Sequence, residues 1–279
     1  MVFANVGNTC YLNAAMHLLL HAPQLTNFFL KNLHASSSSA FVLAYKDLVD
    51  AYWSGGTIPI AGPYDRATTI FLQNHAHIFV PNAQHDALEA AALALEDLHE
   101  GLGPFAGKSK ALEALRGADA AAWKAQKPSL ITEIFGIQTI VNDVAHDHAT
   151  SVHVPATCGS IRDGILHLED PEIVEGGTVR KTRFTHLPLV LLAHIQRFES
   201  PDKKSTEFVE CPRRMNLWGS SFALFAVVFH IGSLHSGGHY TCGVIIDDVL
   251  KIFDDDDSRE ATHIDGRAVC AVAYKKLNP

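Results

Sequence analysis

Apolar residues recur at helical spacing through the first half of the chain. Residues 12–20 place their apolar side chains on one face of a helix. Residues 84–99 repeat this spacing from an expected start at Asn82 or Pro81, and residues 111–125 are rich in alanine. We therefore expect the first half to be mainly helical.

The second half changes to short runs of Val, Ile, Leu and Phe, which are typical of strands. Asp247 and Asp248 separate two of these runs, and a connection of two residues predicts a tight antiparallel hairpin. Residues 136–183 show little periodicity and are expected to form an irregular or small β insert. A helical half followed by a β half predicts an α+β fold with a cleft between the two parts. The expected strands are residues 187–195, 222–230, 240–246, 249–253 and 268–274.

The composition is that of an ordinary globular protein. The chain has 279 residues, of which 47% are hydrophobic and 19% charged, so it forms one large domain or two small ones. Its net charge of 22 − 30 = −8 argues against a nucleic-acid partner and is compatible with a basic protein partner. Apolar runs such as residues 222–229 are too short to cross a bilayer, so no membrane partner is expected.

The five cysteines are widely scattered, and no two of them form a CxxC pair. This spacing argues against a disulfide scaffold and favours a reducing compartment. The first basic residue, Lys31, follows the first apolar run instead of preceding it, which argues against a secretory signal. We therefore expect an intracellular protein of the cytoplasm, the nucleus or both. The cysteines are Cys10, Cys158, Cys211, Cys242 and Cys270.

Cys10 is the first candidate for chemistry. It follows a turn of small residues and is expected in the first turn of the helix over residues 12–20. Free backbone N–H groups and the helix dipole favour a thiolate at that place. Asn5 lies one short turn upstream, and its amide is a candidate donor to an oxyanion. The alternative is that Cys10 is a small buried apolar residue without chemistry.

A cysteine nucleophile needs a base within hydrogen-bond reach, and the base needs a partner that orients it. The chain has 17 histidines, so one histidine alone indicates little. However, Gly237 and Gly238 stand directly before His239 at the start of a predicted strand, where the glycines permit an unusual backbone approach. The alternative is a glycine-rich loop with a surface histidine.

A run of four aspartates follows the next predicted strand. The hairpin at residues 247–248 brings this strand back beside His239, so Asp254 is expected to accept from the imidazole and fix its tautomer. Asp254 comes first after the apolar strand and is therefore expected to point inward, whereas Asp256 and Asp257 are expected in solvent. The alternative is that the whole run is a solvated loop or a weak cation site.

Three blocks in this order resemble the ubiquitin-specific protease family of papain-like cysteine peptidases. Residues 5–13 resemble the cysteine box of the family, and residues 84–89 resemble its Gln-Gln-Asp-Ala-His-Glu helix. Residues 230–240 with residues 253–255 resemble its histidine box, and residues 187–198 resemble a further strand. The resemblance spans nearly the whole chain.

The resemblance implies a papain-like α+β hand in a single catalytic domain over residues 1–279. The helical thumb would comprise residues 1–135, the reduced fingers residues 136–183, and the antiparallel β palm residues 184–279.

The resemblance also implies a role for each matching residue of the catalytic site. Cys10 would be the nucleophile and His239 the base. Asp254 would orient the base, with Asp255 as a second polar partner, and Asn5 would supply the oxyanion hole.

Three further residues would bind the substrate. Asp86 would contact the basic, extended tail of ubiquitin, and a carboxylate there suits arginines near the tail. Tyr240 would line the narrow channel for the tail, and Gln84 would join these two in substrate binding.

The insert departs from the family pattern. The fingers of the family usually hold a structural zinc through two CxxC pairs, but residues 136–183 contain only Cys158. We therefore expect no metal and no cofactor, and the shortened fingers leave affinity and substrate choice open. His146, His148 and His153 are interpreted as solvated loop residues, because their spacing fits no zinc pattern.

The function implied is that of a thiol-dependent deubiquitinase, which hydrolyses the peptide or isopeptide bond after the C-terminal glycine of ubiquitin. Ubiquitin and its conjugates would be the partners. Two alternatives stay open. The reduced fingers would suit a catalytically weak or inactive ubiquitin-binding module, and the tail cleft would also suit a protease for another ubiquitin-like modifier.

Overall fold

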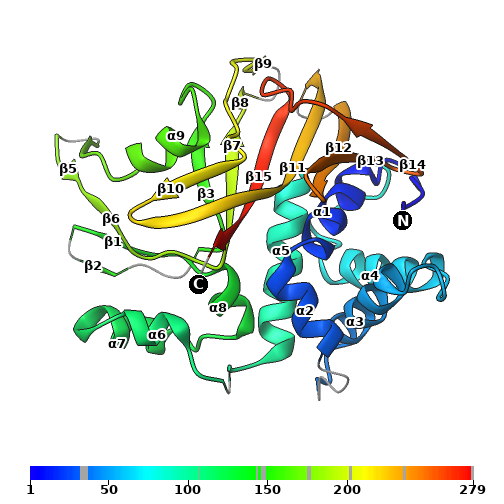
Figure 1. The fold of residues 1–279 in the computed structure, drawn as a ribbon, viewed down its shortest axis with the longest axis horizontal. Helices are drawn as coiled ribbons and strands as arrows, with labels where there is room; N and C mark the ends of the chain where they lie inside the picture. The colour runs from blue at the N-terminus through cyan, green and yellow to red at the C-terminus, as the bar shows by residue number, and fades with distance from the viewer. Residues whose placement is uncertain are drawn as a thin grey trace.

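A computed structural model describes residues 1–31, 37–105, 107–142, 144–145, 149–174, 177–200, 203–234 and 237–277. Within these ranges, a helical half and a β-rich half pack side by side, which confirms the α+β prediction (Figure 1). The helices are α1 (Cys10–Leu20), α2 (Pro23–Lys31), α3 (Ala40–Trp53), α4 (Ala61–Asn74), α5 (Ala87–Leu102), α6 (Lys110–Ala114), α7 (Gly117–Ala125), α8 (Leu130–Phe135) and α9 (Ile161–His167).

Helix α1 lies at the centre of the helical half. All of its residues are buried, and it packs against α5 and against the main sheet. Cys10 is its first residue, which confirms the predicted place of the thiol in the first turn. A helix that is buried all round needs apolar side chains on most of its surface, and the sequence of α1 supplies them apart from the buried polar residues Asn13 and His17.

Two predicted helix boundaries were wrong. The helix predicted over residues 84–99 is α5, which begins at Ala87 and not near Asn82. Asp86 is its N-cap, and Asn82 has a φ of 61°, which lies outside the helical region. The alanine-rich segment forms two helices, α6 and α7, because the chain turns at Gly117, where φ is 55°.

The main sheet has eight strands in the described part of the chain. Their order is β14-β13-β12-β11-β15-β7-β3, with β10 paired to β11 at the side, and neighbours are antiparallel except β3 and β7. All five predicted strand segments lie in this sheet. The strands are β1 (Gln138–Val141), β2 (Val144–Ala145), β3 (Val152–Pro155), β4 (Glu172–Ile173), β5 (Val179–Arg180), β6 (Thr182–His186), β7 (Val190–Gln196), β8 (Phe198–Ser200), β9 (Lys203–Lys204), β10 (Arg214–Leu217), β11 (Ser220–Leu234), β12 (Gly237–Ile246), β13 (Val249–Asp254), β14 (Asp257–Ala261) and β15 (Val269–Leu277).

The predicted hairpin joins β12 and β13. Asp247 and Asp248 both adopt positive φ, at 49° and 65°, as a two-residue turn of the mirror-image type requires. Alternate residues of β13 face two different hydrophobic cores. Phe253 packs in the core shared with α1–α5, whereas Ile252 packs in the core on the opposite face of the sheet, beneath α9.

The insert between the halves is only partly a separate unit. Strands β2, β1 and β6 form a small antiparallel sheet, as a small β insert predicts. However, β3 lies within the same range and extends the main sheet beside β7. Of the histidines interpreted as solvated loop residues, His146 and His148 lie outside the described residues. His153 is exposed, as expected, but lies on strand β3, where its ring packs edge-on against His194 with ring centroids 5.1 Å apart.

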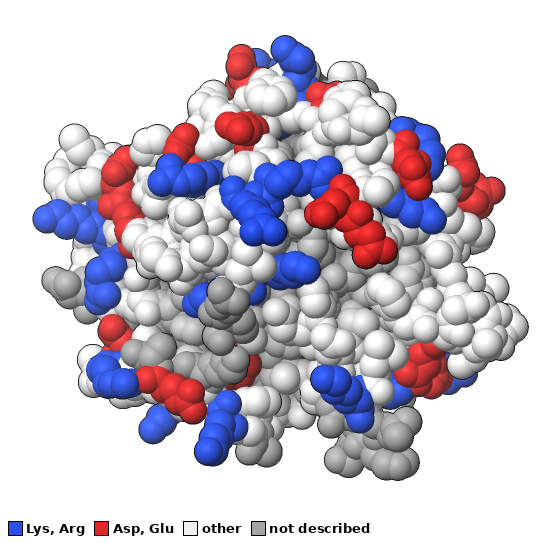
Figure 2. All heavy atoms as spheres, viewed as in Figure 1, with Lys and Arg blue, Asp and Glu red and all other residues white. Residues whose placement is uncertain are grey.

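The surface mixes both charges on the face drawn in Figure 2, where basic and acidic side chains are interspersed among large uncharged areas. The acidic side chains therefore do not form one continuous acidic patch on this face. Among the described residues, no helix combines the length and the apolar character needed to span a membrane.

Candidate active site

Cys10 is 1% exposed and lies where α1 packs against β12. The backbone N–H of Tyr240 donates a hydrogen bond to its thiol. Tyr240 directly follows His239, so the thiol near the start of the chain lies beside the strand that carries the predicted base. The fold therefore joins the two blocks that the sequence separates.

The thiol is held in its protonated form. Burial raises the pKa of Cys10, and the negative charge of Asp255 raises it further. The backbone N–H groups of Tyr240 and of the first turn of α1 lower the pKa, but they do not reverse the direction. The N–H groups at the helix N-terminus favour the thiolate, as expected, but in the free protein desolvation outweighs them.

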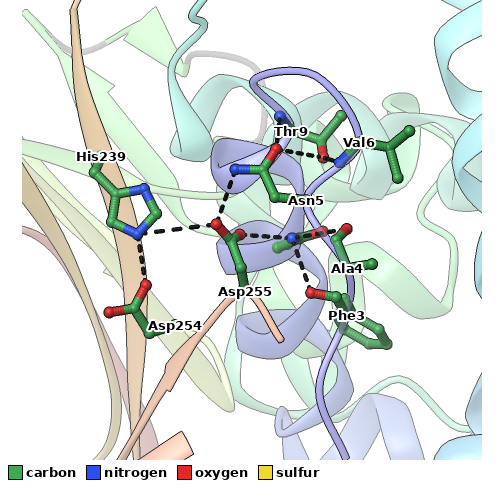
Figure 3. Close-up of polar contacts among 9 residues, drawn as sticks. Phe3, Ala4, Asn5, Val6, Thr9, His239, Asp254 and Asp255 are labelled. Carbon is green, nitrogen blue, oxygen red and sulfur yellow. Dashed lines mark hydrogen bonds and ion pairs between the residues drawn. The ribbon is translucent and has the colours of Figure 1, made fainter. Parts of the chain in front are cut away.

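His239 pairs with Asp254, as the hairpin predicts. Nε2 of His239 lies 2.5 Å from Oδ1 of Asp254, and both side chains are about one-third exposed (Figure 3). A carboxylate only accepts hydrogen bonds, so Nε2 carries the proton and Nδ1 is left as the basic nitrogen. Nδ1 bonds to none of the described residues.

Asp255 is the more enclosed of the two carboxylates. Its side chain is 12% exposed, against 37% for Asp254, so the prediction that Asp254 points furthest inward was wrong. Strand β13 ends at Asp254, and the positive φ of Asp255, at 52°, turns its carboxylate toward the N-terminal segment. Oδ2 of Asp255 lies 3.9 Å from Nε2 of His239. Asp256 and Asp257 are exposed, as expected.

Asn5 is held at both ends of its amide. Its Nδ2 donates to Oδ2 of Asp255 at 2.8 Å, and its Oδ1 accepts from the backbone N–H of Thr9 at 3.0 Å (Figure 3). These contacts settle which end of the amide is nitrogen. One N–H of Asn5 is engaged by Asp255, and the second is free to serve as a donor.

Asp86 lies at the N-terminus of α5, a helix that packs against α1. Its Oδ1 caps the helix by accepting from the backbone N–H groups of Leu88 and Glu89 at 2.7 and 3.0 Å. Its Oδ2 accepts from the hydroxyl of Tyr240 at 3.3 Å and lies 4.0 Å from Nε2 of His194.

An open groove of about 600 Å³ runs beside Asp86 and is also lined by His153, His194 and Phe198. Gln84 lies just before Asp86 in the chain, and its buried Oε1 finds no partner among the described residues. The structure therefore places the three predicted substrate-binding residues close together around the start of α5 and β12.

A family model for ubiquitin carboxyl-terminal hydrolases matches residues 2–272. The chain belongs to the ubiquitin carboxyl-terminal hydrolase family. Because the match includes the segments around Asn5, Cys10, His239 and Asp254, this membership confirms the resemblance drawn from the three sequence blocks.

Curated members of the family share part of this sequence. Ubiquitin carboxyl-terminal hydrolase 5 of Arabidopsis thaliana is 33% identical over 106 residues, which cover 35% of this chain and 11% of that protein. Ubiquitin carboxyl-terminal hydrolase 22 of Homo sapiens is 26% identical over 85% of this chain and 58% of that protein. The chain thus spans less than two thirds of the length of these relatives.

Solved structures confirm the hand-like fold of the family. The SAGA Ubp8/Sgf11/Sus1/Sgf73 DUB module bound to ubiquitin aldehyde contains a chain that matches with a TM-score of 0.79 at 14% identity. The match covers 99% of this chain and 69% of that one. The same module bound to monoubiquitin gives a TM-score of 0.76 at 14% identity.

Sequence reasoning missed two polar residues of this site, Asn13 and Tyr64. Asn13 follows Cys10 by three positions and therefore lies on the same face of α1, one turn further along. A polar residue at this place in an otherwise apolar helix is a signal that could have found it. Tyr64 carries no local signal, because it reaches the site from α4.

The site also contains the group of residues best placed to bind a metal ion. Within the described residues, His239, Asp254 and Asp255 are the group of three potential ligands whose atoms lie within 4.8 Å of one another. These are also the residues predicted to act as base and orienting acids.

Proposed function

We propose that this protein is a thiol-dependent deubiquitinase, which hydrolyses the peptide or isopeptide bond after the C-terminal glycine of ubiquitin. The observation that carries the proposal is the meeting of Cys10 with β12 directly beside the His239–Asp254 pair. A nucleophile on α1 and a paired base and acid on the distant β12–β13 hairpin have no reason to converge in a purely structural core.

The first chemical step is proton transfer from the Cys10 thiol to Nδ1 of His239. The raised pKa of Cys10 favours transfer during the reaction over a preformed ion pair. Asp254, bonded through Nε2, stabilises the imidazolium that forms. The thiolate then attacks the carbonyl carbon of the terminal glycine, and the carbonyl oxygen takes the negative charge.

The free N–H of Asn5 and a backbone N–H near Cys10 stabilise this oxyanion. Collapse of the intermediate breaks the C–N bond, and His239 gives its proton to the departing amine. Water then hydrolyses the thioester, with His239 again acting as the base, and this step restores the thiol. Asp255 holds the Asn5 amide in place during both steps.

The end of the site around Asp86 binds the tail of the substrate in this proposal. Asp86 supplies a fixed negative charge for arginines of the tail, Tyr240 lines the channel, and Gln84 offers a free carbonyl oxygen. The five cysteines are free, which suits a reducing intracellular compartment such as the cytoplasm or nucleus. The division into thumb, fingers and palm at residues 135 and 183 stays a prediction.

A ubiquitin probe with a C-terminal electrophile tests the proposal. The wild-type protein is expected to form one adduct, which intact mass and peptide mapping place on Cys10. Cys10→Ala is expected to lose the adduct and all turnover while still binding ubiquitin. Cys158→Ala, which removes another cysteine that is only partly buried, is the matched control and should label normally.

Two results would change the assignment. A wild-type protein that binds ubiquitin but forms no adduct under reducing conditions is a binding module. A protein that reacts only with probes made from another ubiquitin-like modifier is a protease for that modifier. Turnover that survives Cys10→Ala excludes a Cys10-dependent mechanism.

A further inference from the structure

Asn5 stands at one end of a series of side-chain hydrogen bonds that begins far from the thiol. The hydroxyl of Tyr64, on α4, donates to Oδ1 of Asn13, on α1. Nδ2 of Asn13 donates to Oδ1 of Asp255 at 2.7 Å, and Oδ2 of Asp255 accepts from Nδ2 of Asn5 at 2.8 Å. The series thus connects α4, α1, the β13–β14 turn and the N-terminal segment, and Figure 3 shows the link between Asp255 and Asn5.

Every link in this series has only one workable direction. The carboxylate of Asp255 can only accept, so both asparagines must present nitrogen to it. An amide that presents its nitrogen on one side presents its oxygen on the other. The oxygen of Asn13 therefore needs a donor, which is Tyr64, and the oxygen of Asn5 needs a donor, which is the backbone of Thr9.

The series is enclosed where it starts at Tyr64 and becomes exposed only at Asn5. Tyr64 is 6% exposed and Asn13 is 2% exposed, whereas Asn5 is exposed. The ring of Tyr64 stacks on Phe3, with centroids 4.1 Å apart, and the backbone N–H of Phe3 donates to the carbonyl oxygen of Asp255. Hydrogen bonds in such an enclosed place are strong and costly to leave unmade.

The hydroxyl of Tyr64 keeps its proton. Burial raises the pKa of Tyr64, and the negative charge of Asp255 raises it further. Tyr64 therefore remains a donor across the pH range in which a cysteine protease works, and the direction of the series does not depend on pH in that range.

We propose that Tyr64 is a positioning residue for the reaction: its hydroxyl fixes the Asn13 amide, which fixes the carboxylate of Asp255 and, through it, the N–H of Asn5 that faces the oxyanion. The assignment rests on the proposed function, because it gives Asn5 the oxyanion as its target. It predicts that a hydroxyl on α4, remote from the bond that breaks, affects the stability of the transition state.

Loss of the hydroxyl leaves Oδ1 of Asn13 without its described donor. Nδ2 of Asn13 still faces Asp255 and the carbonyl oxygens of Phe3 and Ala4, which lie 3.3 and 3.4 Å away, so the amide keeps its orientation but is held from one side only. The carboxylate of Asp255 is then held less firmly, and Asn5 depends more on its contact with Thr9. The effect is therefore graded, because the contact of Asn5 with Thr9 is unaffected.

Tyr64→Phe tests the proposal, with Tyr45→Phe as the matched control. Tyr45 is also fully buried on a helix of the same half, but its hydroxyl has no hydrogen-bond partner among the described residues. Tyr64→Phe is expected to lower kcat about fivefold, the size typical of one hydrogen bond, with KM unchanged. Tyr45→Phe is expected to leave both constants unchanged.

A second readout separates positioning from packing. Ubiquitin aldehyde adds to the thiol and places an oxygen in the oxyanion site, whereas unmodified ubiquitin does not. Tyr64→Phe is therefore expected to lower the binding affinity for ubiquitin aldehyde about fivefold relative to the binding affinity for unmodified ubiquitin. Asn13→Asp, which keeps an acceptor for Tyr64 but sets a carboxylate against Asp255, is expected to change this ratio in the same direction and further.

Three outcomes would overturn the proposal. The first is a Tyr64→Phe protein with unchanged kcat and unchanged aldehyde preference. The second is a loss of kcat that disappears when rates are scaled to the titrated fraction of active sites, since that loss reports misfolding. The third is a wild-type protein that forms no aldehyde adduct, which also overturns the proposed function, whereas the first two leave that function standing.

Discussion

The two ends of the site, around Cys10 and around Asp86, are built in different ways. Around Cys10, the polar side chains come from four segments and hold one another, so that Asp255 alone accepts from two asparagines on separate elements. Around Asp86, a local motif fixes one carboxylate oxygen, which caps the helix that follows, and the other oxygen accepts from the single hydroxyl of Tyr240. The first end controls the orientation of reacting groups, whereas the second presents a charge. Substitutions at the first end should therefore change kcat, and substitutions at the second should change KM.

The largest expected effect tests the first end of the site. His239→Gln removes the base but leaves a side chain able to bond to Asp254. Loss of general acid–base catalysis is expected to lower kcat roughly a thousandfold, with KM within about twofold of wild type. Steady-state kinetics on a ubiquitin conjugate measure both constants. A rise in KM with little loss of kcat would contradict the division between the two ends.

The next effect concerns the packing beneath the reacting end. His17 stacks on Phe253, the residue before Asp254, and His21 lies beside it. Burial lowers the pKa of His17, and it lowers the pKa of His21 to about 4. The unfolded chain takes up these protons near its ordinary pKa of about 6.5, so it binds more protons than the folded chain below that pH. The free energy of unfolding should therefore fall as the pH falls from about 6.5 toward 4.

Urea unfolding at pH 7.5, 6 and 5 measures this loss. His21 is expected to contribute about 2 kcal/mol of destabilisation by about pH 5. His21→Gln should reduce the pH dependence, whereas His77→Gln, which alters an exposed histidine, should leave it unchanged. A free energy of unfolding that stays constant over this range would show that the two buried histidines do not limit acid stability.

The smallest effect tests the second end of the site. Asp86→Asn keeps a good N-cap for α5 but removes the negative charge. It is expected to raise KM about tenfold through loss of charge-assisted bonds to the tail, with kcat nearly unchanged. Thermal unfolding should match wild type, because asparagine caps a helix as well as aspartate does. Leu93→Ala, which alters a partly buried apolar residue of α5, is the control. An equal rise in KM in this variant would show that the effect comes from a disturbed helix and not from the lost charge.

The sequence predicted the parts of this site that depend on local spacing. The helical period placed Cys10 in the first turn of α1, and the pair Asp247-Asp248 predicted the hairpin that brings Asp254 to His239. It misplaced the start of α5, because Asn82 or Pro81 was interpreted as the start and Asp86 as a residue of the first turn, whereas Asp86 is the cap. Periodicity reports which faces are buried, but a cap is a hydrogen bond made by one side chain.

The sequence alone determined the family, the α+β class and the identity of the candidate residues Cys10, His239 and Asp254. Motifs and hydrophobic periodicity depend on residues that are close in the chain, so they can be recognised without the structure. Only the tertiary structure decided how those residues are used. It made Asp255 more enclosed than Asp254, raised the pKa of Cys10 through burial, and brought Tyr64 to Asn13 from another helix. Burial and long-range hydrogen bonds depend on which surfaces meet after folding, and no local pattern records that meeting.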